Sequence, residues 1–127
     1  MTIRLRNLSL LTLLTGLVSC SGYPETPEEV VEQFSEYLSS GQCEKAMDLC
    51  IESARETVQG SIDAGCEPYE TTVDSVICDI QGDEAFCDCY ENRESFGSIS
   101  FPYELEKAEG KWKVRNNSKD IGVEEEL

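Results

Sequence analysis

The sequence has 127 residues and is strongly acidic, with 10 Lys+Arg, 26 Asp+Glu, no histidine and a formal net charge of −16 at pH 7. A chain of this length suits one domain, and so small a domain gains stability from covalent cross-links. The charge opposes binding to phosphate backbones, which depends on Lys and Arg, and it excludes nucleic acid as a partner. The lack of histidine excludes catalytic triads and metal centres that use this residue.

The first 19 residues have the pattern of an export signal, with two arginines before an apolar run. This run, Leu8 to Val18, is too short for a transmembrane helix, because a span needs about 20 apolar residues. Leu17-Val18-Ser19-Cys20 resembles the lipobox of bacterial lipoproteins, which favours lipidation over an ordinary cleaved signal. We therefore expect removal of residues 1–19 and acylation of Cys20, which then holds the chain on a lipid bilayer of the bacterial cell envelope.

Processing at Cys20 predicts how the rest of the chain is arranged. Ser21, rather than an aspartate, follows the cysteine, which favours the outer membrane in a cell with two membranes. We expect residues 20–25 to form a tether, 26–119 to form a single domain and 120–127 to form an acidic tail. Cleavage removes two basic residues and no acid, so the domain is repelled by anionic headgroups and is held by its acyl chains alone.

Six further cysteines follow the lipidation site, and an even number outside the cytoplasm indicates disulfides. We expect three bridges, with 15 possible connectivities, among these residues: Cys43, Cys50, Cys66, Cys78, Cys87 and Cys89. Metal binding is the alternative, but zinc sites usually show Cys-x-x-Cys or histidine spacings, and this sequence has neither. The Cys87-Asp88-Cys89 pair is a weak redox motif. No metal site and no cofactor are predicted.

The domain is expected to begin with a helix. Thr26 suits the N-cap, Pro27 suits the first helical position, and Glu29 completes a capping box. Apolar residues then recur at helical spacing and form one stripe, and Gly41 ends the helix. The stripe consists of Val30, Val31, Phe34, Tyr37 and Leu38.

A second helix is predicted from about Gln42, with Cys43 and Cys50 on its buried face. Seven residues of unbroken helix separate these two cysteines by about 10.5 Å. A disulfide needs Cα atoms within about 7 Å, so each cysteine requires a partner outside the helix. A weaker helical pattern continues through Ala54, Val58 and Ile62 and ends at Gly65.

After Pro68 the pattern alternates and predicts a strand over residues 70–80. A two-residue loop at Gly82-Asp83 would place Cys78 opposite Cys87, on a face directed to the core. These two thiols can bond to each other or reach the helices. A second hairpin has its turn at Glu109-Gly110, which pairs Leu105 with Val114 and puts Trp112 on the same face.

Five basic residues lie in or just after this last hairpin: Lys107, Lys111, Lys113, Arg115 and Lys119. We interpret them as a solvated face that pairs with nearby acids, in preference to an anion-binding site.

The elements predict an α+β domain, with helices first and an antiparallel sheet after them. The opening from Thr26 to Phe34, and the ending that joins Tyr103-Glu104-Leu105 to Gly110-Lys111-Trp112-Lys113-Val114, resemble small bacterial lipoproteins of the nuclear transport factor two-like superfamily. These are usually assigned to a domain of unknown function. The resemblance implies a cystatin-like cone, in which two or three N-terminal helices pack on a curved antiparallel sheet of about four strands around a pocket.

Two functions fit such a domain. The favoured one is a non-enzymatic, membrane-anchored module that binds a small ligand, a peptide or an envelope protein. The alternative is a lyase or isomerase of the ketosteroid-isomerase type, which needs a carboxylate base and a tyrosine or protonated acid in an apolar pocket. Asp79 and Asp88 are the carboxylates most closely associated with the sheet, but they fall on the outer face, so no catalytic residue is predicted. A cone filled by Phe34, Phe101 or Trp112 would exclude the enzyme.

Overall fold

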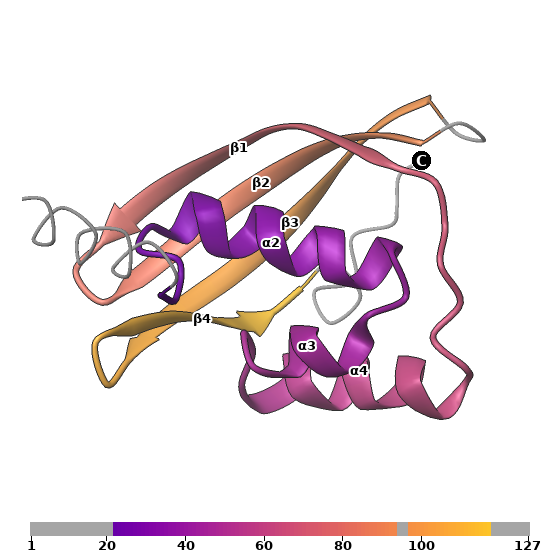
Figure 1. Ribbon diagram of the computed structural model, residues 1–127. Helices are drawn as coiled ribbons and strands as arrows, with labels where there is room; N and C mark the ends of the chain where they lie inside the picture. Colours follow the sequence, from indigo (N-terminus) through magenta and orange to yellow (C-terminus); the bar gives the residue numbers. More distant parts are fainter. Residues whose placement is uncertain (1–21, 94–96, 118–127) are drawn as a thin grey trace, which may run out of the picture.

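In the computed structural model, which describes residues 22–93 and 97–117, three helices are followed by four strands. The helices are α2 (Pro27–Ser39), α3 (Cys43–Met47) and α4 (Glu52–Asp63), and the strands are β1 (Thr72–Gln81), β2 (Glu84–Arg93), β3 (Gly97–Ala108) and β4 (Lys111–Asn116). The strands form one antiparallel sheet in the order β1-β2-β3-β4 (Figure 1). The predicted α+β class is confirmed. The predicted signal peptide, Cys20 and the acidic tail lie outside the described residues.

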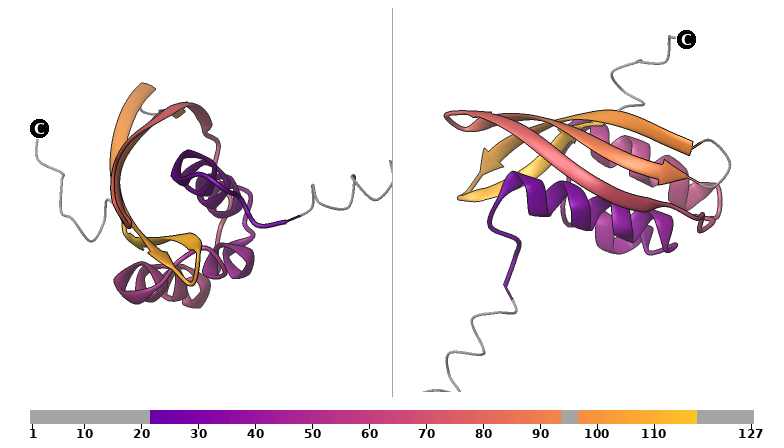
Figure 2. Two further views of the ribbon diagram at one scale, coloured as in Figure 1. Left: turned by 90° about the vertical axis from the view of Figure 1, so that its left-hand side faces the viewer. Right: turned by 90° about the horizontal axis from the view of Figure 1, so that it is seen from above.

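The sheet curves around α2, which crosses its concave side (Figure 2). Half of the predicted capping box forms, because the Thr26 hydroxyl accepts from the Glu29 amide at 3.1 Å. The Glu29 carboxylate accepts instead from the amide of Glu25, the residue before the N-cap, at 3.1 Å. Val30, Val31 and Phe34 on the apolar stripe are fully buried. No helix within the described residues is long and apolar enough to cross a membrane.

The helical segment after Gly41 is shorter than predicted. The helix α3 ends at Met47, and Cys50 lies beyond it, in an isolated parallel bridge with Val114 of β4. Two backbone bonds of 2.8 Å fix this bridge, from the Ile51 amide to the Val114 carbonyl and from the Val114 amide to the Leu49 carbonyl. Backbone groups of Leu49 and Ile51 therefore hydrogen-bond to the edge of β4, where a longer helix would have bonded them within itself.

Both hairpins have the predicted registers. Gln81 pairs with Glu84 and Cys78 with Cys87, and in the second hairpin Leu105 pairs with Val114. In the second turn Glu109 and Gly110 both have positive φ angles, 55° and 80°, as a type I′ turn requires. The strands therefore present the expected faces to α2.

The core lies between α2, the concave face of the sheet and the other two helices. Inward residues alternate along β2, where Ala85, Cys87 and Cys89 are buried. The Phe34 ring contacts the Tyr103 ring edge to face, with centroids 6.0 Å apart. Ile80 shares the inward face of β1 in register but is 50% exposed, because it lies near the end of an edge strand.

Two disulfides are present in the described residues. Cys43–Cys66 joins the start of α3 to the segment after α4, over a Cα–Cα distance of 6.2 Å. Cys78–Cys87 joins β1 to β2 at directly opposed positions.

The expected third disulfide is absent from this described part, because Cys50 and Cys89 are buried free thiols. Val114, the bridge partner of Cys50, lies across β3 from Ala85 of β2. Cys89 is four residues further along β2, about 13 Å away along the strand. That separation is too large for a disulfide.

Candidate functional site

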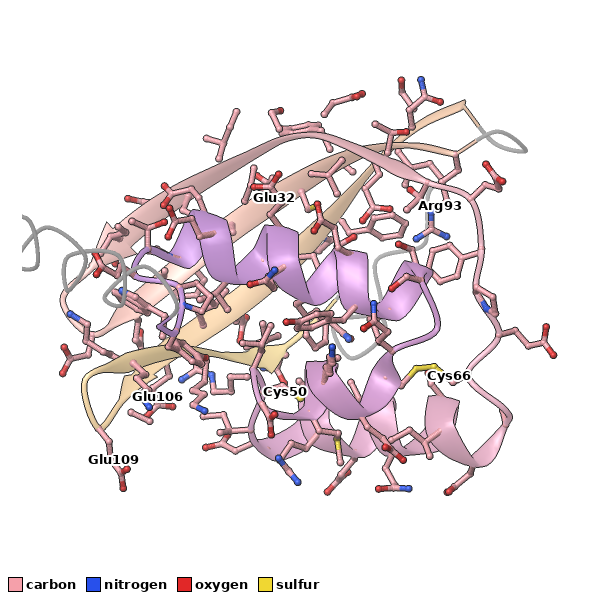
Figure 3. The ribbon with its side chains drawn as sticks, viewed as in Figure 1. Glu32, Cys50, Cys66, Arg93, Glu106 and Glu109 are labelled. Atoms are coloured by element: carbon pink, nitrogen blue, oxygen red, sulfur yellow. A yellow bond between two sulfur atoms is a disulfide. The ribbon has the colours of Figure 1, made fainter. Side chains whose placement is uncertain are left out.

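A cavity of about 420 Å³ opens at the end of the cone where α2 finishes. It is bounded by α2, α3, α4, the segment that leads to β1, the end of β2, the middle of β3 and the residue that follows β4. Its lining residues are Leu38, Cys43, Thr57, Val58, Ser61, Ala64, Cys66, Glu67, Tyr69, Arg93, Phe101, Tyr103 and Asn117. Figure 3 places Arg93 and Cys66 at this end, far from the β3–β4 turn at Glu109. The volume suits a small ligand.

Glu91 of β2 lies behind the cavity wall and is 1% exposed. Its carboxylate accepts hydrogen bonds from the Ser35 hydroxyl at 2.9 Å, the Thr71 hydroxyl at 2.9 Å and the Cys89 thiol at 3.5 Å. Buried charges are stable only when they are paired and hydrogen-bonded. These contacts, together with a cationic partner, satisfy that requirement for Glu91.

Arg93 is that cationic partner. Its Nε and Nη2 atoms both lie 3.1 Å from Glu91 Oε1. The guanidinium carbon also lies 4.5 Å from the centre of the Tyr69 ring and 4.9 Å from the centre of the Phe101 ring. A buried carboxylate and two aromatic rings therefore fix one guanidinium in the wall of the cavity.

Sequence reasoning missed this pair. Ala85, Cys87 and Cys89 alternate on the inward face of β2, and Glu91 is the next residue in the same alternation. A carboxylate that continues an apolar face, with an arginine two residues later, was the available signal.

The two sheet carboxylates singled out in the sequence do not lie at the cavity. Asp79 and Asp88 are exposed on the outer face of the sheet, as expected from their position in the strands. Asp79 accepts a hydrogen bond of 3.0 Å from Gln81. Neither residue lines the cavity.

Two phenols and one thiol near the cavity are neutral at pH 7. Burial, supported by the charges of Cys89 and Glu91, raises the pKa of the Tyr103 phenol well above its ordinary value. Burial also raises the pKa of Tyr69, and the nearby Arg93 offsets this only in part. Burial and then Glu91 raise the pKa of the Cys89 thiol to about 12. The thiol is therefore protonated and is not an activated nucleophile.

The filling of the cone differs along its length. Phe34 and Trp112 are buried in the core, as expected for a filled cone, whereas Phe101 is half-buried in the wall of the open cavity. Part of the cone is therefore solid and part is open.

The opposite end is closed by Tyr23. Its hydroxyl donates a 2.6 Å hydrogen bond to the Trp112 carbonyl, and the ammonium groups of Lys111 and Lys113 lie 5.3 and 5.1 Å from its ring centre. Burial, and then the charges of Cys50 and Asp48, raise the pKa of Tyr23 to about 12. Tyr23, expected in the tether, is thus attached to the domain.

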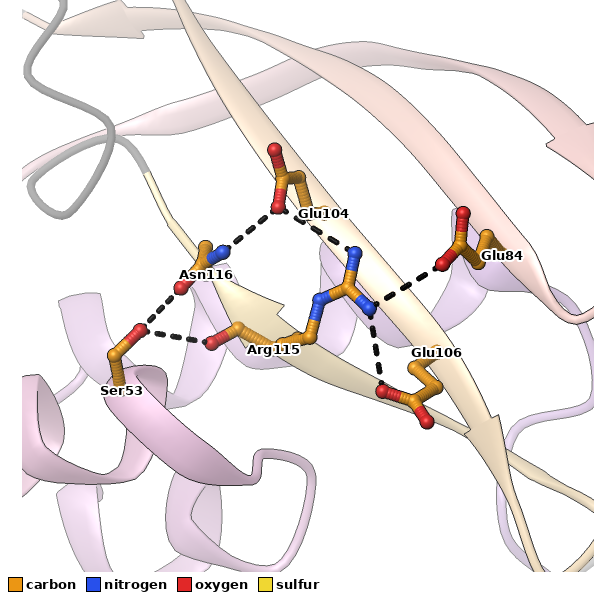
Figure 4. A network of polar contacts seen from close by, with 6 residues as sticks. All are labelled: Ser53, Glu84, Glu104, Glu106, Arg115 and Asn116. Carbon is orange, nitrogen blue, oxygen red and sulfur yellow. Dashed lines mark hydrogen bonds and ion pairs between the residues drawn. The ribbon is translucent and has the colours of Figure 1, made fainter.

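Arg115 lies outside the core in a separate network (Figure 4). Its guanidinium pairs with Glu106 at 3.2 Å and with Glu84 and Glu104 at 3.5 Å each. Asn116 donates to Glu104 at 2.7 Å, and the Ser53 hydroxyl joins Asn116 to the Arg115 carbonyl. This part of the basic cluster pairs with neighbouring acids, as predicted, whereas Lys119 lies outside the described residues.

Comparisons with known proteins show the fold. No protein-family model and no curated protein matches the sequence. A Campylobacter jejuni protein assigned as an NTF2-like transpeptidase matches with a TM-score of 0.55 and 16% identity, over 72% of this chain and 98% of its own. A cystatin-like protein of unknown function from Nostoc punctiforme matches with a TM-score of 0.50 and 15% identity, over 68% of this chain and 80% of its own.

A third similar structure is a SEC-C motif containing protein from Rhodopseudomonas palustris. Its TM-score is 0.50 at 11% identity, over 80% of this chain and 84% of its own. The first two matches agree with the resemblance seen in the sequence. The described part of the chain therefore has the cone fold of these NTF2-like and cystatin-like structures.

Proposed function

We propose that this protein is a lipid-anchored binding domain of the bacterial cell envelope, and that it takes a small ligand or a peptide segment into its cavity. The observation that carries the binding role is the cavity of about 420 Å³, walled by Arg93 and by the aromatic side chains of Tyr69 and Phe101. Small-molecule sites combine such apolar walls with a few oriented polar groups.

The polar chemistry of the wall favours binding over catalysis. A general base must accept a proton from its substrate. Glu91, the buried carboxylate nearest the cavity, already accepts from Ser35, Thr71 and Arg93 and is shielded by them. Because these hydrogen bonds occupy the Glu91 carboxylate, it is poorly placed to take a proton from a substrate.

The anchor is supported by the lipobox pattern that ends at Cys20, and two disulfides suit an oxidising compartment outside the cytoplasm. Cys20 precedes the docked Tyr23 by three residues, so an acylated N-terminus would lie within about 10 Å of it. The cavity is at the other end of α2, whose 13 residues span about 20 Å. A bound bilayer would therefore lie beside the closed end, with the cavity directed into the aqueous space.

Intact mass of the membrane-extracted protein tests the anchor. The expected mass is that of residues 20–127 plus acyl chains, and a Cys20→Ser variant would remain unprocessed. Recovery of an unacylated chain from the wild type would contradict the proposal.

Binding is tested by NMR titration of the protein with a library of small amides, acids and dipeptides. We expect the NMR signals of Tyr69, Arg93 and Phe101 to shift on binding. The variant Phe101→Ala should bind the same compounds more weakly. Shifts confined to the outer sheet face would contradict a role for the cavity.

A lyase or isomerase remains the second candidate, favoured by one observation. Tyr103 lines the cavity, and burial, then the charges of Cys89 and Glu91, raise the pKa of its phenol, so a tyrosine and a carboxylate lie near each other where an acid–base pair is needed. The test is deuterium exchange from solvent at a carbon next to the carbonyl of a bound compound. The enzyme requires exchange that Glu91→Gln abolishes, whereas a binding domain gives none.

A further inference from the structure

We infer that the cavity selects an uncharged carbonyl or amide group on an apolar body and discriminates against the matching carboxylate. The inference rests on the proposed binding function and specifies the ligand of the same cavity. It follows from how Arg93 is held and from which charges surround it.

Arg93 gives the wall a hydrogen-bond donor of fixed direction. Two of its nitrogens, Nε and Nη2, face one oxygen of Glu91 at 3.1 Å each. The side chain is 23% exposed and lines the cavity, so the part of the guanidinium turned away from Glu91 is accessible to a ligand. A planar N–H donor so oriented recognises an oxygen acceptor such as a carbonyl.

The charge of Arg93 is already compensated. Glu91 is 1% exposed and is ion-paired with it, and the cavity wall of the described residues holds no second cation. The other charged residue in the wall is Glu67, an acid. The whole sequence adds a net charge of −16. A carboxylate that entered would therefore meet excess negative charge, whereas a neutral carbonyl would meet only a donor.

The remaining wall fits the body of such a ligand. Leu38, Val58 and Phe101 offer apolar contacts, and the Cys43–Cys66 disulfide fixes one side of the cavity. Ser61 and Tyr69 add hydroxyls at the same wall. The ligand class is accordingly an amphipathic amide or ketone, including a peptide segment that carries no free acid.

The experiment compares two probes that differ in one group, N-acetylphenylalanine amide and N-acetylphenylalanine, in calorimetric or NMR titrations of the mature protein. The amide should bind at least about tenfold tighter than the acid, a factor equal to about 1.4 kcal/mol. Glu91→Gln uncovers the Arg93 charge and should invert the preference. Glu109→Gln makes the same charge change at the far end of the molecule and should leave the ratio unchanged (Figure 3).

Because Glu91 is buried and its replacement can disturb folding, a second variant changes a charge at the surface of the cavity. Glu67 is exposed, so Glu67→Gln is expected to fold, and it should raise the affinity for the acid severalfold without changing that for the amide. Equal or tighter binding of the acid by the wild type would overturn the selectivity while leaving the binding function standing. Failure of both probes to shift Tyr69, Arg93 or Phe101 would overturn the inference, and failure of the whole library would overturn the proposed function with it.

Discussion

The two ends of the cone use the same kind of contact for opposite purposes. At the closed end Lys111 and Lys113 lie over the Tyr23 ring, and Lys107 lies 5.2 Å from the centre of the Trp112 ring. These lysines cover aromatic rings from the solvent side. At the open end a cation is held from within, because Arg93 is paired with the buried Glu91.

The difference teaches where binding can occur. The Tyr23 ring is covered by two lysine side chains, and its hydroxyl is satisfied by the Trp112 carbonyl. A guanidinium fixed by a buried carboxylate leaves its aromatic neighbours, Tyr69 and Phe101, in the wall of a cavity. In this protein, lysine side chains cover the ring at the closed end, whereas a buried carboxylate holds the cation at the open end.

The largest loss of stability is expected when the Glu91 carboxylate, which holds Arg93 at the open end, is removed. Glu91→Ala leaves Arg93, Ser35 and Thr71 without their acceptor, and we expect the free energy of unfolding to fall by about 3 kcal/mol, as for other broken buried pairs. Urea denaturation measures the change. The double variant Glu91→Met with Arg93→Met removes both charges and should lose less. A single variant as stable as the wild type would show that the pair does not support the cavity.

The two disulfides differ in their place relative to the cavity and in the length of chain that they enclose. Cys43–Cys66 borders the cavity and closes a separation of 23 residues, whereas Cys78–Cys87 closes only 9. Loop entropy predicts losses of about 3.4 and about 2.6 kcal/mol when each pair is replaced by alanines.

Ligand titration distinguishes these two losses. We expect only the Cys43→Ala/Cys66→Ala variant to weaken binding of the amide probe, because only this bridge lies in the cavity wall. Equal weakening by the Cys78→Ala/Cys87→Ala variant would show that the two ends are not independent.

Alkaline pH acts on both ends through groups whose pKa is raised by folding. Burial raises the pKa of the Cys50 thiol from 9.0 to about 11 and that of the Cys89 thiol from 9.0 to about 12. These protonated groups contribute their stability below pH 9, and it is lost as the pH rises through 11 and 12. Thermal unfolding between pH 7 and pH 11 should show a flat region and then a decline. Cys50→Ala should decline less steeply, and a stability that increased above pH 9 would contradict the assignment.

The smallest effect is expected at the closed end. Tyr23→Phe removes the hydrogen bond to the Trp112 carbonyl and should cost about 1 kcal/mol in urea denaturation. Ligand affinity should stay the same, because Tyr23 is not in the cavity wall. Tyr90→Phe, on the exposed outer face, is the matched control and should change neither quantity. A loss of affinity in Tyr23→Phe would show that closure and binding are coupled.

The sequence by itself determined the local elements. The helix N-cap at Thr26 and the two-residue hairpin turns depend on neighbours only a few positions apart. Because strand pairing about such a turn fixes the opposite residues, the Cys78–Cys87 contact was also available from the sequence.

Only the tertiary structure decided the rest. Cys43 found Cys66 while Cys50 and Cys89 stayed free, because the docking of helices on the sheet sets which thiols come within bonding distance. The end of α3 at Met47 depends on backbone pairing with β4, about 65 residues later in the chain. The burial of Glu91 beside Arg93 likewise depends on α2, which supplies Ser35 and covers that face of the sheet. Patterns in a sequence indicate local hydrogen bonds and the face of a helix or strand on which each side chain lies. The site is formed by contacts between distant segments, which no local pattern specifies.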